Sequence, residues 1–189
     1  MAAVQQVIPR AVPLSQVDIW FQDEARVGQR GTRARVWAPR GVRMRLPRQQ
    51  GRQFTYVFGA ICPATSQAVG LIMPCANTHA MQHHLNEIAQ AVPPSRHAVV
   101  VLDRAPWHTT RQLTVPANLS LLLLPPLSPE LNPVEQVWNW LRQHHWANRI
   151  FKNYEALLNA CCCAWNQFTR LPQLISSIGS RSWAILHMF

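Results

Sequence analysis

The sequence predicts a single α/β domain built on a mixed sheet of five strands flanked by helices. The chain has 189 residues, of which 48% are hydrophobic, so it can bury one sizeable core but hardly two. Strand-like segments come first, and strands and helices alternate after them, an order typical of an α/β sheet. We expect the fourth and fifth strands to be parallel neighbours, because a helix-forming connection separates them.

The first predicted strand is QVDIWFQ, residues 16–22. Its odd-numbered positions are apolar, so one face of the strand packs against a core. Asp23 continues this face and ends the strand. The residues that follow, 26–52, hold nine arginines and no acid.

The next elements are a hairpin and a helix. FTYVFGAIC (54–62) and AVGLIM (68–73) are separated by PATSQ, as in two strands joined by a turn. A helix is predicted over residues 77–92, with Asn77 or Thr78 as its cap and a double proline after it. Its apolar residues recur at helical spacing: Met81, Leu85, Ile88 and Val92.

The fourth strand is HAVVVLD (97–103), which is apolar enough to be buried on both faces. LSLLLL (119–124) is the fifth, and helices follow from Pro133 and from about Asn153. In the helix from Pro133, Trp138 lies on the apolar stripe, so we expect it in the core.

The charge of the chain predicts a polyanionic partner such as nucleic acid. It has 18 Lys+Arg against 8 Asp+Glu, a formal net charge of +10. Only Lys152 is a lysine; this excess of arginine suits bidentate phosphate contacts and is equally explained by a GC-rich genome. No apolar run reaches the roughly 18 residues of a membrane span, and no secretory signal begins the sequence, so we expect a cytosolic protein with reduced cysteines.

Three of the few acids occupy positions typical of a site. Asp23 and Asp103 end predicted strands, and Glu135 lies in the first turn of the helix after the fifth strand. Ends of parallel strands open onto one edge of an α/β sheet, where sites usually form. Carboxylates gathered there repel one another unless a cation or proton is present, and Mg²⁺ prefers such oxygen ligands.

Each of these residues also has a structural interpretation. Glu135 can close a capping box with Asn132. Asp103 can cap a helix that starts near residue 106, and Asp23 can pair with a nearby arginine. His108 is either a metal ligand or a core histidine. Spacing alone leaves these alternatives open.

Four segments resemble the catalytic-domain motifs of bacterial insertion-sequence transposases related to the mariner elements: WFQDEARVG, RVWAPRG, VVVLDRAPWH and LLLLPPLSPELNPVEQVWNWL. The match covers about residues 17–148. The resemblance implies a ribonuclease H-like fold that brings an Asp-Asp-Glu triad together. Carried over by motif, the catalytic and metal-binding residues are Asp23, Asp103 and Glu135.

The resemblance also implies an activity. Two Mg²⁺ ions, which Mn²⁺ can replace, would serve DNA strand cleavage and strand transfer of an insertion sequence in the bacterial cytosol, in association with the nucleoid. Double-stranded DNA, as element ends and target, and a second copy of the chain in a homodimer are the implied partners, with no membrane involved. Residues that we assign to DNA binding are the arginines of the basic stretch: Arg26, Arg30, Arg33, Arg35, Arg40, Arg43 and Arg45. Possible accessory residues are Arg104, His108 and Asn132.

The chain departs from the family pattern at two points. Arg104 stands where the family usually has Asn after the second Asp, and the helix-turn-helix region that family members carry before the catalytic motifs is not found here. The chain is then either the downstream product of a split or frameshifted gene, with an upstream helix-turn-helix polypeptide as partner, or a remnant of a decayed element. We divide the chain into an N-terminal extension (1–16), the catalytic domain (17–170) and a C-terminal tail with helical potential (171–189). Two alternatives are an inactive DNA-binding remnant of a transposase and another ribonuclease H-like nuclease.

Overall fold

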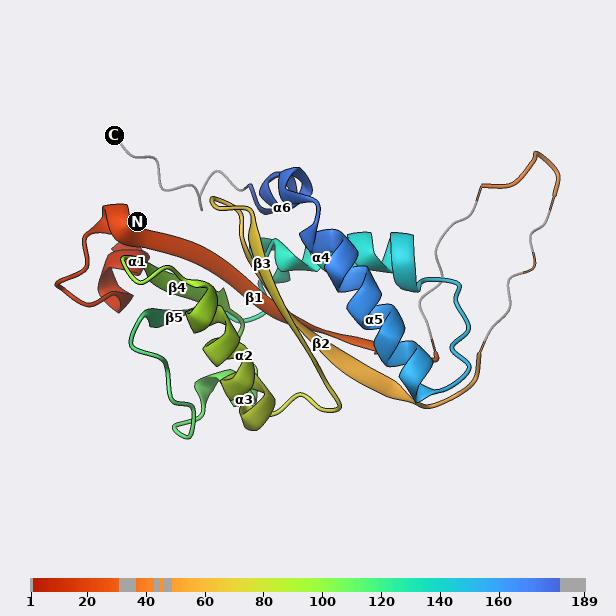
Figure 1. Cartoon of the computed structure of the whole chain (residues 1–189), viewed down its shortest axis with the longest axis horizontal. Coiled ribbons are helices and arrows are strands. Elements are labelled where there is room, and N and C mark those ends of the chain that lie inside the picture. Colours follow the sequence, from red (N-terminus) through yellow and green to blue (C-terminus); the bar gives the residue numbers. More distant parts are fainter. Residues whose placement is uncertain (1, 31–36, 43–44, 46–48, 181–189) are drawn as a thin grey trace.

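The computed structural model describes residues 2–30, 37–42, 45 and 49–180. Its centre is a five-stranded sheet in the order β3-β2-β1-β4-β5, with helices packed on both faces (Figure 1). This is the mixed α/β sheet that the sequence predicts.

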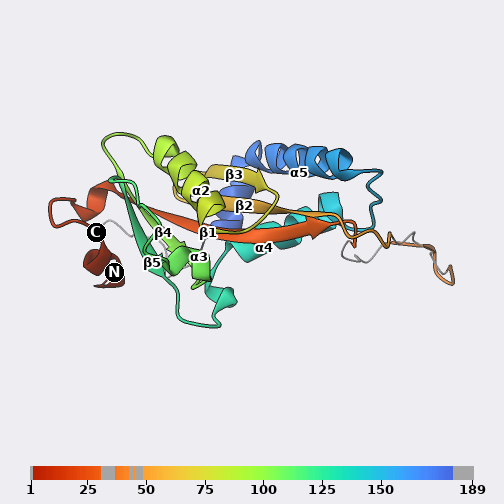
Figure 2. The ribbon, with the colours of Figure 1, turned by 90° about the horizontal axis from the view of Figure 1, so that it is seen from below.

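The strands are mixed in direction. β1 (Val17–Gly28) pairs in parallel with β4 (His97–Leu102) and antiparallel with β2 (Phe54–Cys62). β3 (Gln67–Met73) completes the hairpin with β2, and β5 (Leu119–Leu123) lies parallel to β4. Figure 2 shows β1 as a long strand that passes between α2 on one side and α4 on the other.

The prediction that Asp23 ends β1 is wrong. The pairing with β4 stops at Phe21, but β2 continues to pair with β1 as far as Gly28. Buried residues continue the alternation in this second half, at Ala25 and Val27. Asp23 therefore lies inside β1, two residues beyond the last residue paired with β4.

One face of the sheet is covered by α2 (Thr78–Ala91) and the short α3 (Pro106–Thr109). Asn77 caps α2 as predicted, because its side chain accepts a hydrogen bond from the backbone N–H of Ala80 at 2.9 Å. Large apolar residues of the strands and of α2 form this core: Trp20, Phe58, Met81, Leu85, Ile88 and Leu102.

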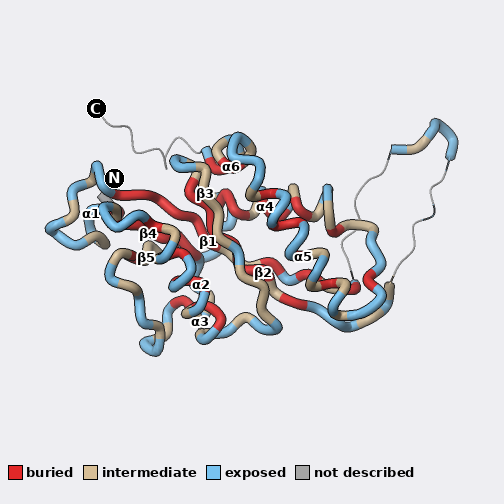
Figure 3. Tube along the Cα trace, viewed as in Figure 1, coloured by how far each residue is buried: buried red, intermediate tan, exposed pale blue. Residues whose placement is uncertain are grey.

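The opposite face is covered by helices from both ends of the chain, and Figure 3 shows the buried strands that lie beneath them. Trp138 is fully buried there, as predicted. The elements outside the sheet on this side and in the loops are α1 (Ala2–Val7), η1 (Leu14–Gln16), η2 (Pro129–Leu131), α4 (Val134–Leu141), the π-helical turn η3 (Arg142–Trp146), α5 (Tyr154–Thr169) and α6 (Pro172–Gly179).

Gly59 of β2 allows α4 and α5 to lie close to the sheet. A Cβ atom at this position would lie 2.6 Å from the rings of both Trp138 and Trp165. Gly59 is also the residue paired with Asp23 across β1 and β2. The missing side chain therefore leaves the space into which Trp138 reaches toward Asp23.

Among the described residues, no helix combines the length and the apolar character that a membrane crossing requires.

Candidate active site

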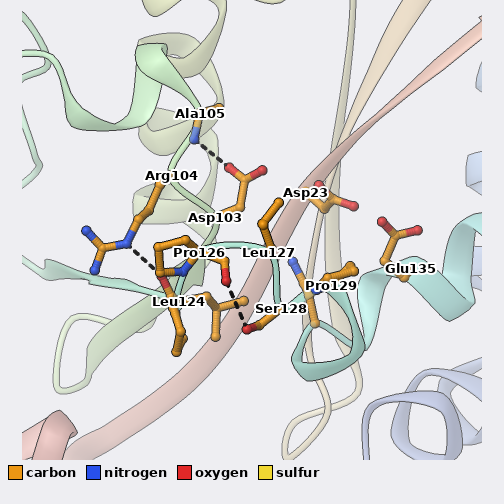
Figure 4. A pocket seen from close by; sticks show the side chains of 12 residues that line it. Asp23, Asp103, Arg104, Ala105, Leu124, Pro126, Leu127, Ser128, Pro129 and Glu135 are labelled. Atoms are coloured by element: carbon orange, nitrogen blue, oxygen red, sulfur yellow. Dashed lines mark hydrogen bonds between the residues drawn. The ribbon is translucent and has the colours of Figure 1, made fainter.

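Asp23, Asp103 and Glu135 line one pocket of about 390 Å³ (Figure 4). Asp23 comes from the middle of β1, Asp103 directly follows β4, and Glu135 lies in the first turn of α4. The loop from Leu124 to Pro129 forms another wall. The structure thus brings together the three carboxylates that the sequence selects.

Asp23 is held by Trp138. The indole Nε1 donates a hydrogen bond of 2.8 Å to Asp23 Oδ2. Burial, helped by the charges of Glu24 and Glu135, raises the pKa of Asp23 to about 7, against the lowering effect of the Trp138 bond. Within the described residues Asp23 forms no ion pair with an arginine. No ion pair in the described part of the chain therefore compensates the charge of its carboxylate.

Asp103 has two fixed partners at the edge of the pocket. Its Oδ1 accepts hydrogen bonds from the backbone N–H of Ala105 at 2.9 Å and from Nδ1 of His108 at 2.8 Å. The His108 bond is the main reason that the pKa of Asp103 is lowered. The N-cap of α3 is Ala105, so Asp103 stabilises the turn before this helix rather than capping it.

His108 joins Asp103 to a carboxylate that the sequence analysis missed. Its ring is fully buried, and Nε2 lies 2.8 Å from Oε1 of Glu24. Burial lowers the pKa of His108, but the hydrogen bonds and charges of Asp103 and Glu24 outweigh it and raise the pKa to about 9. Both ring nitrogens are engaged, so His108 is a buried bridging histidine and not a free metal ligand.

Glu24 is the centre of a polar cluster on the α2 side of the sheet. Besides His108, it accepts hydrogen bonds from Nε2 of Gln22 at 2.9 Å and from Nε1 of Trp107 at 3.2 Å. Alternation in β1 was the available signal, because it places Glu24 on the face opposite to Asp23, the face on which the VLDRAPWH segment packs.

The capping box predicted for Glu135 is not formed. The backbone N–H of Asn132 donates to the carbonyl of Pro129, so it has no place for the Glu135 carboxylate. Asn132 instead accepts from the N–H of Val134 at 3.2 Å and donates through Nδ2 to the carbonyl of Gln22 at 2.8 Å. The buried Asn132 thus fastens the loop to β1 beside Asp23, and Glu135 is left to line the pocket.

The sequence of residues 18–158 matches a family described as DDE superfamily endonuclease. The chain belongs to this family. The uncharacterized protein y4pE/y4sA of Sinorhizobium fredii is 50% identical to it over 131 residues, which cover 69% of this chain and 97% of that protein.

Solved structures share the fold of this DDE domain. The catalytic domain of the Mos1 mariner transposase has a TM-score of 0.51 at 16% identity, over 87% of this chain and 83% of that one. The Mos1 paired-end complexes with Mn and with Mg have TM-scores of 0.58 and 0.57 at 18% and 16% identity. They match 87% and 86% of this chain, which spans 56% of the longer Mos1 chain. The predicted ribonuclease H-like fold is confirmed.

The donor set of the pocket formed by Asp23, Asp103 and Glu135 fits a hard divalent cation. All three side chains offer carboxylate oxygens, and the uncompensated charge near Asp23 favours a cation. In the part of the chain that the structure describes, no three acidic, His or Cys side chains lie close enough to hold one ion together. Mg²⁺ usually binds one or two carboxylates together with water and phosphate, so the open pocket suits it.

Arg104 lines the same pocket. Its Nε donates to the carbonyl of Leu124 at 2.9 Å, which anchors the exposed side chain beside Asp103. The anchored guanidinium keeps its remaining N–H groups for another acceptor, such as a phosphate.

The arginines predicted to bind DNA are described only in part. Arg26, Arg30, Arg40 and Arg45 are exposed, and the guanidinium of Arg26 lies 3.8 Å from the centre of the Phe54 ring. The other predicted contacts lie outside the described residues: Arg33, Arg35 and Arg43.

Proposed function

We propose that this chain is the catalytic domain of a transposase that cuts DNA strands and joins them to a target, using divalent metal ions. The observation that carries the proposal is the convergence of Asp23, Asp103 and Glu135 on one pocket in a DDE-family chain. Related Mos1 structures are paired-end complexes with Mn and with Mg, which supports the same chemistry here.

Asp23, Asp103 and Glu135 would hold the metal ions. Mg²⁺ or Mn²⁺ bound there would supply a lowered pKa for an attacking water and positive charge for the leaving oxygen. Two ions are the expected number. The chain itself contributes the positions of the ligands: Trp138 fixes Asp23, and His108 fixes Asp103.

The substrate of the proposed reaction is double-stranded DNA. A net charge of +10 attracts the phosphate backbone, and the exposed arginines of the basic stretch are the proposed contacts. Arg104 is a further proposed phosphate contact at the pocket itself. A homodimer, an upstream helix-turn-helix polypeptide and a place in the bacterial cytosol on the nucleoid belong to the same proposal.

Glu135→Gln tests the proposal most directly. Strand cleavage of plasmid DNA and of element-end duplexes, with Mg²⁺ or Mn²⁺, should fall by at least about a hundredfold, because an amide is a poorer ligand than a carboxylate. If the DNA upstream encodes the proposed helix-turn-helix polypeptide, that polypeptide should be included in the cleavage assay. Glu130→Gln is the matched control, since Glu130 is an exposed acid of the preceding loop that does not line the Asp23 pocket. Equal loss in both variants would remove Glu135 from the proposed triad.

An inactive DNA-binding remnant is the second candidate, and Arg104 is the observation that favours it. A fixed positive charge beside Asp103 opposes a cation at that carboxylate. A parent chain that binds DNA but cleaves none with either metal, while Arg104→Asn does cleave, would support this candidate.

A further inference from the structure

Leu127 combines full exposure with an unfavourable backbone conformation. Its side chain is 99% exposed and its φ is 57°, in the left-handed region. A leucine rarely adopts this region, because its Cβ crowds the backbone there. An exposed leucine alone is ordinary, but one that is held in strain commonly marks a functional site.

The loop that carries Leu127 is stiff on both sides. Pro126 precedes it, and Pro129 follows two residues later, so φ is fixed at both positions. Ser128 Oγ donates to the carbonyl of Pro126 at 3.3 Å. Asn132 fastens the end of the loop to β1. These restraints hold Leu127 outward instead of letting it turn into the core.

Leu127 lines the pocket that contains the three carboxylates (Figure 4). A phosphodiester bound at those carboxylates would bring its neighbouring sugar and base close to the walls of this pocket. The wall contributed by the loop is uncharged and almost entirely apolar, and consists of Leu124, Pro125, Pro126, Leu127, Ser128 and Pro129. Such a wall suits a sugar or a base far better than it suits a phosphate.

We propose that Leu127 packs against the face of the base next to the phosphodiester to be cut, after that base has left the stack. Base faces are covered inside a duplex, so contact requires local unstacking, and inserted apolar side chains are known to produce it. The inference rests on the proposed DNA cleavage at this pocket. It adds a residue that opens the duplex and influences which base occupies that position.

Two substitutions separate the apolar contact from the backbone conformation. Leu127→Asn removes the apolar surface but tolerates the left-handed conformation, so the fold should be as stable as the parent. Leu127→Met keeps an apolar side chain of similar volume. Leu171→Asn is the control, because Leu171 is 41% exposed, precedes α6 as its N-cap residue and does not line the pocket.

The probe is a short duplex with a central nick and 2-aminopurine next to it, whose fluorescence rises on unstacking. Binding is measured with Ca²⁺ in place of Mg²⁺ or Mn²⁺, so that the measurement does not depend on cleavage. The parent, Leu127→Met and Leu171→Asn should raise the fluorescence and prefer the nicked to the intact duplex. Leu127→Asn should give little rise in fluorescence, and its preference for the nicked over the intact duplex should be about tenfold weaker than that of the parent.

Cleavage by the parent with Mn²⁺ is measured in parallel, so that the two proposals fail separately. A Leu127-dependent rise without any cleavage would support the base contact and count against the proposed function. Cleavage by the parent with the same fluorescence in the parent and Leu127→Asn would overturn the Leu127 contact alone. A parent that binds the nicked duplex without any rise would also overturn it.

Discussion

His108 and Asp103 are joined by a hydrogen bond of 2.8 Å between the imidazole Nδ1 and the carboxylate Oδ1. The bond connects a fully buried ring to a carboxylate whose side chain is 57% exposed. Glu24 holds the other nitrogen of the ring, so the orientation of Asp103 at the pocket depends on a buried acid on the far side of His108.

Glu24→Gln should therefore weaken metal use without removing any group that lines the pocket. An amide can still accept from His108, but the ring loses its charged partner and holds Asp103 less firmly. We expect about a 10- to 100-fold loss in apparent metal affinity, the range found when partners of metal ligands are changed. The apparent metal affinity is measured from the cleavage rate as a function of Mn²⁺ concentration. Glu87→Gln is the control, because Glu87 lies on the exposed side of α2. An unchanged metal dependence would show that Glu24 does not act through Asp103.

Stability should fall as the pH rises through the range in which His108 loses its proton. The pKa of His108 is raised from 6.5 to about 9 in the folded chain, so its contribution is complete below pH 6.5 and is lost by about pH 9. In metal-free buffer the free energy of unfolding should decrease by at most about 3 kcal/mol over this range. Urea unfolding of the parent and of His108→Gln tests it; parallel pH curves would contradict the assignment. The ionisation of Asp23, whose pKa is raised from 3.8 to about 7, changes the unfolding free energy mainly below this pH range.

Trp138→Phe should separate the packing role of this residue from its hydrogen bond. Phenylalanine retains much of the buried ring but cannot donate to Asp23, so the pKa of Asp23 should rise further and metal binding near neutral pH should weaken. Trp138→Ala should in addition cost roughly 3–5 kcal/mol of unfolding free energy. Trp146→Phe is a close control: Trp146 is buried and stacks on Trp138, but its Nε1 has no hydrogen-bond partner among the described residues. Equal metal affinity in both phenylalanine variants would exclude a role for the bond.

DNA affinity should depend steeply on salt. Each arginine that contacts a phosphate adds about 0.9 to the slope of log affinity against log salt. Arg40→Gln and Arg45→Gln should each lower the slope by roughly this amount for any DNA sequence, whereas Arg170→Gln, at the end of α5, should leave it unchanged. Fluorescence anisotropy over a salt series measures the slopes. A slope that none of these substitutions alters would place the contact surface elsewhere.

The elements with a regular apolar pattern were predictable from the sequence. The five strands, the capped helix α2 and the buried Trp138 follow from periodicity and turn residues alone. The extension of β1 was not predicted, because Asp23 interrupts the apolar alternation before it resumes at Ala25 and Val27, and pairing with β2 maintains the strand.

The candidate site was predictable to the extent that motifs and strand ends mark it. Asp23, Asp103 and Glu135 could be selected. Alternation in β1 places Glu24 on the opposite face, but its role could not be predicted, since it depends on the packing of His108 from a distant segment. The capping box was wrong for a similar reason. Asn132 makes a long-range bond to β1, and local spacing gives no sign of it.

The separation of the three carboxylates along the chain also governs when they can meet during synthesis. Asp23 leaves the ribosome first, but Trp138 and Glu135 follow it by more than a hundred residues and must dock through α4 before the pocket exists. Domains generally fold as units once their sequence has emerged. A nascent chain that stops before α4 therefore holds only part of the acid set, and an interrupted translation product carries the DNA-attracting arginines without the complete pocket.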